Sequence, residues 1–466
     1  MPPRAQRSKS YSGAGATIEQ AHSPARDTKA KAACLFSSTG IGELGIENCG
    51  IEIVSALELV PWRVSLYREN FPNSGVMEGD IWKQKTKFIQ LTNDRLDGQE
   101  LFLLYATPPC QGMSTNGRGR LKWEISQGHR QEEDPRNRLI IPTVQIVKKL
   151  RPRWVLFENV PRMKDTAIRD ELGRTTNIID YISRHLGPDY VGTAQVVACE
   201  DFGIPQKRQR LITIFTRDPK GKDYFFSNGR SFIPPALFES RKTLRDAIGN
   251  LPPLDARPGR NRRTDFHRYH YVAALNDEKY WWVENTAEGD TAFNNQCTNS
   301  RCRFQDNRKH RDEKHGGKWT AGKSTPIHCE KCGELLPRPS ILEEGGSRRL
   351  LKGFHSAYRR MKWDEPARTL TQNLIYEASD NKLHPEQNRV LSIYEALILQ
   401  TIDRYKFKFE IEGKDIGTAR IAEAIGESVP PYLIEKLCRM MLGTSNQVGA
   451  ADRKSELCPS NQGINA

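Results

Sequence analysis

The sequence lacks the long apolar runs of a membrane protein and the apolar leader of a secreted one. No run approaches the ~20 apolar residues that a membrane-spanning helix needs, and the N-terminus has no stretch of signal-peptide type. Cysteine is too sparse for a disulfide scaffold, with ten in 466 residues. We therefore expect a reduced cytoplasmic protein without a membrane partner, in which cysteines serve as metal ligands, nucleophiles or core residues.

Large apolar side chains are also scarce at both ends of the chain. Residues 1–31 are rich in Ser, Ala, Arg and Lys, and residues 443–466 have a similar texture. Such segments bury too little apolar surface to fold, so we predict a disordered basic arm and a disordered tail. The chain between them is long enough for two domains at ~100–200 residues each.

Acidic residues are outnumbered by basic ones. The chain has 71 Lys and Arg against 57 Asp and Glu, a formal net charge of +14. A basic excess of this size suits a polyanionic partner. A generally basic surface explains the charge equally well, so composition alone does not decide for nucleic acid.

The first half of the chain alternates short apolar runs with helical patterns. The runs "ACLFSS", "IEIVSALEL", "LFLLYATPP", "RWVLFENV" and "RLITIF" read as strands, and "LIIPTVQIVKKLRP" has helical spacing. This alternation predicts βαβ units and a parallel sheet, with ligands bound beyond the carboxyl ends of the strands. Polar residues stand at those predicted ends: Ser37, Ser38, Glu58, Cys110, Glu158 and Asn159.

A glycine-bearing turn follows the first predicted strand, in "LFSSTGIGELG". Gly40 and Gly42 would let the backbone approach a ligand, Glu58 could bind ribose hydroxyls, and Asp80 could accept from an adenine amino group. Taken together these features favour an adenosine-containing ligand. A tight turn without a ligand and solvated strand-end acids are the alternatives.

Cys110 stands where an apolar run meets two prolines, in "LLYATPPCQGMS". Prolines stiffen the turn, and the loop after it is polar, so the thiol would be rigid and reachable. Only a thiolate is a good nucleophile, and nearby cations would favour it. Downstream, "QKRQR" sends Arg208 and Arg210 to one face, where they could grip a carbonyl oxygen or a phosphate. An exposed basic edge strand is the alternative.

These motifs resemble, in order, those of the DNA (cytosine-5)-methyltransferase family, of the bacterial and phage modification type. The resemblance rests on "FSSTGIGELG", "GDI", "PPCQGMS", "FENV", "IPQKRQR", "ARTLTQN" and "GESVPPYL". It implies a Rossmann-like α/β domain that uses S-adenosylmethionine, with a smaller, irregular target-recognition domain. By resemblance, the catalytic domain spans residues 32–218 and 362–442, and residues 219–361 form the recognition domain.

The resemblance also implies residue roles. The Cys110 thiolate would attack C6 of a flipped-out cytosine, Glu158 would protonate N3, and Asn159 would fix the loop beside it. Arg208 and Arg210 would bind O2. The implied cofactor contacts are Phe36, Ser38, Gly40, Gly42, Glu58, Asp80, Ile81, Pro109, Leu139, Gly426, Glu427 and Ser428.

Two of these cofactor positions depart from the family pattern. Ser38 replaces a glycine, and a serine fits there if its backbone φ is negative, so we expect cofactor binding to be kept. Glu427 replaces an asparagine, and its carboxylate could still accept from the cofactor's ammonium group.

The recognition region carries two features of its own. The segment "ARPGRNRRTDFHRYHY" interleaves arginines with aromatic residues, which favours a DNA face over a basic linker. We expect DNA contacts from Gln111, Ser114, Arg260, Arg262, Arg263 and Arg268.

The second feature is a set of four cysteines, Cys297, Cys302, Cys329 and Cys332. They form a C-x4-C pair and a C-x2-C pair separated by 26 residues. This spacing favours a structural zinc site with four thiolate ligands. Disulfides are the alternative, and His310, His315 and His328 are weaker candidate ligands.

The sequence thus predicts a sequence-specific DNA methyltransferase acting on cytosine C5. A tRNA cytosine-5 methyltransferase and a catalytically silent DNA-binding protein remain alternatives. The expected partner is double-stranded DNA. A cognate restriction endonuclease could act separately on the same site. We expect a monomer, associated with the nucleoid.

Overall fold

The structure is a computed structural model that describes residues 29–109, 134–315, 318–322, 324–351, 357–379 and 381–446. Within 312–321 only the backbone is described. The predicted N-terminal arm and C-terminal tail lie almost entirely outside these ranges. Cys110, Gln111 and Ser114 also lie outside the described residues.

Within the described ranges, seven strands form one sheet in the order β3-β2-β1-β4-β5-β10-β8. Strands β1 to β5 run parallel to one another, whereas β10 is antiparallel to β5 and β8. In this order the strands are β3 (Gly75–Glu78), β2 (Glu52–Glu58), β1 (Lys31–Leu35), β4 (Leu103–Ala106), β5 (Trp154–Asn159), β10 (Gln209–Thr216) and β8 (Val191–Ala198).

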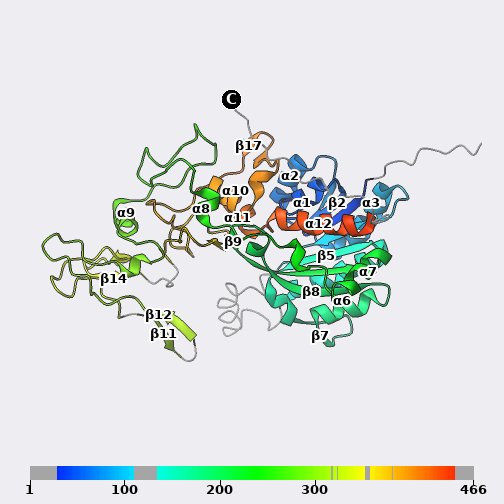
Figure 1. Ribbon diagram of the computed structural model, residues 1–466, viewed down its shortest axis with the longest axis horizontal. Coiled ribbons are helices and arrows are strands. Elements are labelled where there is room, and N and C mark those ends of the chain that lie inside the picture. The colour runs from blue at the N-terminus through cyan, green and yellow to red at the C-terminus, as the bar shows by residue number, and fades with distance from the viewer. Residues whose placement is uncertain are drawn as a thin grey trace, which may run out of the picture.

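Helices cover both faces of this sheet, which explains why its central strands are continuous apolar runs. Apolar side chains of α1, α7 and α12 fill one core, and those of α3, α5 and α6 fill the other (Figure 1). Their bounds are α1 (Glu43–Asn48), α7 (Pro219–Ser227), α12 (Pro431–Asn446), α3 (Ile81–Leu96), α5 (Ile140–Leu150) and α6 (Ile178–Leu186). No helix in the described ranges is long and apolar enough to cross a membrane.

The seven-stranded sheet and the helices that cover it are called the sheet lobe below. Two segments of this lobe lie beyond the expected bounds of the catalytic domain. Helix α7 lies within the region assigned to the recognition domain, yet Phe225 and Phe232 pack in the core beneath the sheet. The Phe232 ring meets Trp154 of β5 edge-on at 5.4 Å. Helix α12 continues past Gly443 to Asn446. The sheet lobe therefore includes residues to about 238, and its last helix reaches into the expected tail.

A third core lies between the sheet lobe and the recognition region (Figure 1). It is built from α2 (Pro61–Asn70), α8 (Leu244–Ile248), α10 (Ile393–Leu399) and α11 (Thr418–Glu427). The chain returns to the sheet lobe where β15 (Ala367–Arg368) pairs with β9 (Gln206–Lys207). Helix α10 begins with a capping box in which Ser392 and Glu395 bond each other's backbone N–H.

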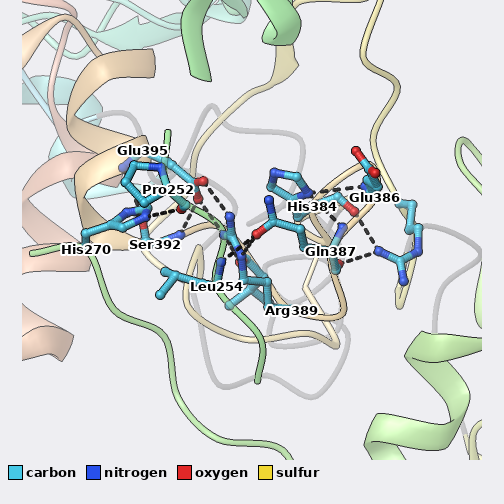
Figure 2. Close-up of polar contacts among 11 residues, drawn as sticks. Pro252, Leu254, His270, His384, Glu386, Gln387, Arg389, Ser392 and Glu395 are labelled. Carbon is cyan, nitrogen blue, oxygen red and sulfur yellow. Dashed lines mark hydrogen bonds and ion pairs between the residues drawn. The ribbon is translucent and has the colours of Figure 1, made fainter. Parts of the chain in front are cut away.

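The recognition region has short elements: α9 (Asp277–Glu284) and the hairpins β11–β12 (Asp312–His315 and Lys318–Ala321) and β13–β14 (Ser340–Leu342 and Arg348–Leu350). Figure 2 shows the polar contacts between this region and the start of α10, together with contacts within the segment that leads into α10. His270 lies 3.1 Å from the Ser392 hydroxyl, and Arg389 makes a fully buried bidentate pair with Glu395, at 2.7 Å for each bond. The recognition region is thus fixed to the third core through buried hydrogen bonds.

Minor elements complete the described chain: the hairpins β6–β7 (Ala167–Arg169 and Thr175–Asn177) and β16–β17 (Glu410–Ile411 and Lys414–Asp415), and the 3-10 turns η1 (Pro135–Leu139), η2 (Pro161–Asp165), η3 (Cys199–Asp201), η4 (Pro235–Leu237), η5 (Ala292–Asn294) and η6 (Ile402–Arg404).

Candidate active site

A cavity of about 520 Å³ opens at the carboxyl edge of the parallel strands. It is bounded by the turn after β1, the ends of β2 and β5, the start of α3 and the end of α11. Fifteen of the residues predicted from the sequence line it: Phe36, Ser38, Gly42, Glu58, Asp80, Ile81, Pro109, Leu139, Glu158, Asn159, Arg208, Arg210, Gly426, Glu427 and Ser428. Residues as far apart in the chain as Phe36 and Ser428 therefore share one site.

The turn after β1 holds Ser38 in a left-handed conformation, with φ of 49°. The negative φ that an unstrained serine would need at this position is therefore not found. The Ser38 N–H donates to Glu58 Oε2 at 2.8 Å, and this bond fixes the turn against β2. A non-glycine residue in this region carries a penalty of roughly 1–2 kcal/mol, so the serine strains the turn.

Gly40 is the one predicted cofactor contact in the described ranges that does not line the cavity. Its φ is 87°, and a Cβ built on it would lie 2.4 Å from the Phe71 ring. Glycine is needed there for packing against α2. Gly426 is different: a Cβ there would lie 2.1 Å from the Gln372 backbone nitrogen, so glycine permits two segments to meet at the cavity.

Backbone N–H groups hold the two acids expected to bind the nucleoside. Glu58 Oε1 accepts from Val60 N at 2.9 Å, in addition to the bond from Ser38. Asp80 caps α3 by accepting from Trp82 N at 3.0 Å. Both carboxylates are thus oriented by short local bonds at the cavity wall.

Glu427 is paired with a cation that the sequence did not suggest. Its Oε2 lies 2.7 Å from Arg63 Nη2, and the same nitrogen lies 2.5 Å from Glu423 Oε1. Burial raises the pKa of Glu427, and Arg63 opposes that rise. The carboxylate offered for the cofactor's ammonium group therefore already has a cationic partner, which it shares with Glu423.

Glu158 and Arg210 form a buried ion pair at the cavity floor, with Arg210 Nε 2.7 Å from Glu158 Oε1. Strands β5 and β10 bring them together. Burial raises the pKa of Glu158, and the charges of Arg210 and Arg208 only partly offset this. A carboxyl with a raised pKa beside a guanidinium can hold and deliver a proton.

Arg208 takes a different role from Arg210, although both were expected to act on one group. It is 1% exposed, and it donates to the carbonyls of Leu370 at 2.9 Å, Gly426 at 3.1 Å and Ser428 at 2.6 Å. Its guanidinium thus fixes the returning segment, residues 362–442, against the sheet lobe.

Asn159 fixes the turn that leads to Cys110. Its Nδ2 donates to the Pro108 carbonyl at 2.9 Å, and its Oδ1 accepts from Val160 N at 2.8 Å. The amide is 3% exposed, so both bonds are shielded from water. Pro109, the last residue described before Cys110, lines the cavity.

Several cavity residues were missed in the sequence, among them Glu43, Arg63, Tyr105, Arg136 and Gln372. Burial raises the pKa of Glu43 to about 8. Glu43 stands inside the glycine-bearing segment and Gln372 directly follows "ARTLT". Their closeness to a motif is the sequence feature that could have identified them as cavity residues. Arg63 and Tyr105 had no such signal, because a helix surface and a buried strand explain them equally well.

Residues 31–443 match a family model described as C-5 cytosine-specific DNA methylase. The chain belongs to this family. The predicted family and the predicted methyltransferase fold are thereby confirmed, and the protein is an S-adenosylmethionine-dependent DNA cytosine-5 methyltransferase.

Similar proteins agree with the family match. The chain is 30% identical to the Type II methyltransferase M1.HgaI of Avibacterium volantium, over 87% of this chain and 96% of that relative. It is 24% identical to the Type II methyltransferase M1.HphI of Haemophilus parahaemolyticus, over 88% and 85%. A crystal structure of a DNA modification methyltransferase encoded within an E. coli prophage aligns with a TM-score of 0.51, at 20% identity over 90% of this chain and all of that chain. This last likeness supports the fold.

The four cysteines of the methyltransferase's recognition region converge. Their sulfur atoms all lie within 4.8 Å of one another, with Cys297 and Cys332 at 3.7 Å and Cys302 and Cys329 at 3.9 Å. Among the residues described, this group contains no histidine. His310 instead lies 2.6 Å from the Thr325 hydroxyl, and the His315 side chain is not among those described.

The arginines proposed to face DNA are partly engaged with acids. Arg263 pairs with Asp265 at 3.0 Å, and Arg268 pairs with Glu410 and, at 3.5 Å, with Asp415. A second cavity, of about 150 Å³, lies where the recognition region meets the returning segment. Its basic lining residues are Arg359, Arg360, Lys362 and Arg368.

Proposed function

We propose that the methyltransferase modifies C5 of a cytosine in a specific duplex DNA sequence, through a transient bond between Cys110 and C6. The observation that carries this proposal is the buried Glu158–Arg210 pair at the floor of the cavity, next to the turn that delivers Cys110. Glu158 supplies a proton donor, Arg210 supplies a cation for a developing oxyanion, and the turn places the nucleophile next in the chain.

The residues divide the chemistry as follows. The Cys110 thiolate adds to C6, and protonation of N3 by Glu158 neutralises the charge that develops in the ring. Arg210 stabilises the negative charge on O2 and keeps Glu158 oriented. Once C5 has taken the methyl group, loss of the C5 proton to a base restores the C5–C6 double bond and expels the thiolate, and N3 returns its proton to Glu158. The cytosine must leave the duplex stack to reach this cavity.

The cavity fits S-adenosylmethionine. Its volume of about 520 Å³ is that of a small-molecule site, and it holds carboxylates as well as apolar side chains. Glu58, Asp80 and Ile81 would hold the nucleoside, with Phe36, Ser38, Gly42, Pro109, Leu139, Gly426, Glu427 and Ser428 around the remainder. When bound, the cofactor supplies an electrophilic methyl group on its sulfonium.

Covalent trapping tests this mechanism. Duplex DNA carrying 5-fluorocytosine at the target should give a stable protein–DNA adduct with wild type and none with Cys110→Ala. Glu158→Gln should reduce methyl transfer by roughly 10²–10⁴-fold while leaving cofactor binding nearly intact. An adduct with Cys110→Ala, or none with wild type, would show the mechanism to be wrong.

Two alternatives have weaker support. A tRNA substrate is disfavoured because the matching family model is a DNA methylase and the relatives named above are Type II methyltransferases. Methyl transfer to duplex DNA and to tRNA, compared directly, separates the two. A catalytically silent DNA-binding protein is disfavoured by the assembled Glu158–Arg210–Asn159 arrangement.

We further propose that the enzyme acts in the cytoplasm on nucleoid DNA, as a monomer, and protects a site cut by a separate restriction endonuclease. Light scattering on the purified protein tests the monomer. Sequencing of methylated bases in a host that expresses the enzyme gives the site. DNA so modified should resist the cognate endonuclease.

DNA contacts are proposed from Gln111 and Ser114 near the nucleophile and from Arg260, Arg262, Arg263 and Arg268 in the recognition region. Arg263 and Arg268 must first exchange their acidic partners for phosphate. Replacing Arg260 should weaken binding to all sequences and flatten the salt dependence if it contacts phosphate, whereas loss of specificity would indicate a base contact.

We also propose that Cys297, Cys302, Cys329 and Cys332 bind a structural zinc ion. A tetrahedral zinc with bonds of ~2.3 Å separates its sulfur ligands by ~3.8 Å, close to the 3.7 and 3.9 Å in the structure. Within the described chain, the cysteine cluster's apolar core has only Cys297, Cys329 and Leu336 as buried members. A metal would supply the stability that so small a core cannot.

Metal analysis of the purified enzyme tests the zinc site. Wild type should hold one equivalent of zinc, and Cys329→Ser should lose it together with DNA binding. Cys49→Ser is the matched control, because Cys49 lies on the sheet lobe away from the cluster, and its zinc content should be unchanged. Far less than one equivalent in wild type, or full retention in Cys329→Ser, would contradict the proposal.

A further inference from the structure

A buried carboxyl, Glu43, lines the cofactor cavity with one oxygen lacking a hydrogen-bond partner. The side chain is 2% exposed, and Oε1 has no partner among the described residues. The Ser37 and Tyr105 hydroxyls also lack a well-formed hydrogen bond among the described residues, although Ser37 interacts with Glu43 itself, and both residues line the same cavity. Buried polar groups in native proteins are nearly always hydrogen-bonded, so these three atoms indicate a ligand that completes them.

Among the residues that the structure describes, no cation interacts with Glu43. The groups that interact with it are Ser37 beside it, Glu58 of β2, Cys34 of β1, Tyr67 of α2 and Tyr105 of β4. None of these is positively charged. The missing partner of an ionised Glu43 is therefore a cationic hydrogen-bond donor inside the cavity.

We propose that Glu43 binds the α-ammonium group of S-adenosylmethionine, with the Ser37 and Tyr105 hydroxyls as further acceptors. The inference rests on the proposed use of this cavity for the cofactor. An ammonium has three N–H donors, which matches three oxygen atoms without partners. The sulfonium has no N–H group and could satisfy none of them. Glu43 thus takes the role expected of Glu427, which already pairs with Arg63.

The pH dependence of binding follows from this contact. Burial, and to a smaller extent Glu58, raises the pKa of Glu43 to about 8, although Ser37 and the Glu43 backbone lower it. Ligand-free enzyme at neutral pH is therefore mostly protonated at Glu43. Since an ammonium favours the carboxylate, binding releases a proton, and affinity rises with pH by up to ~10-fold per unit. Measurements should stay below the ligand's own ammonium pKa of ~8.

Calorimetric titration tests the contact without any turnover. S-adenosylmethionine and S-adenosylhomocysteine are titrated into wild type and Glu43→Gln at pH 6.0 and 7.5. Both ligands carry the ammonium, so both should bind Glu43→Gln roughly 10–100-fold more weakly at pH 7.5. The variant should also lose most of the pH dependence of wild type.

Glu47→Gln is the matched control. It lies one turn further along α1, is exposed and does not line the cavity, so its affinities and pH dependence should equal those of wild type. The melting temperature of ligand-free Glu43→Gln provides a second readout. A raised pKa means that Glu43 destabilises the folded state increasingly as pH rises from about 4.5 towards 8. The variant should therefore melt at or above wild type at pH 7.5, while binding the cofactor less well.

Each other outcome has a definite meaning. Unchanged affinity of Glu43→Gln overturns the proposal, as does a loss confined to S-adenosylmethionine, which would assign Glu43 to the sulfonium. Tighter binding at lower pH would show that Glu43 donates to the cofactor's carboxylate and would also overturn it. Failure of wild type to bind either ligand would instead count against the proposed cofactor cavity itself.

Discussion

The sheet lobe and the recognition region are each stabilised by a different kind of internal contact. Two large apolar clusters cover the faces of the seven-stranded sheet, and they include side chains such as Phe157, Trp154 and Tyr181 that are entirely buried. The recognition region has a smaller apolar cluster around Trp282 and Phe293. It relies more on buried arginines and on the cysteine cluster.

Arg360 and Arg338 show how this polar anchoring works. Arg360 donates five hydrogen bonds, to the carbonyls of four residues and to the Asn388 side chain, at 2.5 to 2.9 Å. Arg338 donates to the carbonyls of Asn295, Arg308 and Pro326. Burial lowers the pKa of each guanidinium to about 10. Directional bonds can thus fix loops to one another where apolar area is limited.

This difference predicts which substitutions destabilise each region most. An apolar core tolerates small changes of side-chain shape. Removing one partner of a buried hydrogen bond or ion pair costs more, because the other partner stays buried with neither water nor protein to bond to. The following substitutions test that contrast, from the largest expected effect to the smallest.

Arg389→Met should lower the free energy of unfolding by about 3–5 kcal/mol, because it leaves Glu395 charged and buried without its partner. Arg389→Met combined with Glu395→Leu should recover a large part of this loss. Urea unfolding of both variants measures the effect. Arg349→Met is the control, since the Arg349–Glu343 pair is exposed and should contribute less than about 1 kcal/mol. A double variant no more stable than the single one would contradict this account of the buried pair beside the recognition region.

Arg360→Met should lower the free energy of unfolding by about 2–4 kcal/mol, because several buried carbonyls lose their donor. DNA binding should be lost before cofactor binding as urea increases, since these bonds hold the recognition region and not the cavity. Parallel loss of both functions would show that the two regions unfold as one unit.

Acid should destabilise the start of α10 in the third core and stabilise the sheet lobe. Burial raises the pKa of Glu395, but Arg389 and its hydrogen bonds lower it to about 2, so its stabilisation is present above pH 4.5 and is lost as the pH falls. Between pH 5 and pH 3 this amounts to about 2 kcal/mol. Glu43 has a raised pKa and should stabilise the sheet lobe as the pH falls from 8. Urea unfolding of the two variants across this pH range measures both effects. Glu395→Gln should abolish the loss of stability in acid, and Glu43→Gln should abolish the gain.

Ser38→Gly should raise the free energy of unfolding by about 1 kcal/mol, because glycine adopts the left-handed conformation without strain. Ser37→Gly is the control, since its φ lies outside that region and glycine would only add chain entropy. Thermal melting of the ligand-free enzyme measures both. A lower melting temperature for Ser38→Gly would show that the serine side chain contributes more than the strain removes.

Much of the site could be predicted because its residues stand at strand ends. The period of the apolar runs identifies the strands, and parallel strands bring their carboxyl ends to one edge. Glu58, Glu158 and Asn159 were located in this way, and the structure places them around one cavity. The left-handed φ of Ser38 could not be predicted, because it depends on the bond from its N–H to Glu58 of a neighbouring strand.

The sequence by itself determined the family, the α/β class, the order of the site motifs and the convergence of four cysteines, because each follows from local pattern or spacing. Only the tertiary structure decided which charges meet. Arg63 reaches Glu427 across 364 residues, Arg208 bonds the returning backbone while Arg210 faces Glu158, and Glu43 meets no cation within the described part of the chain. The physical reason is that charge pairing and desolvation depend on distances between segments, which spacing along the chain does not fix.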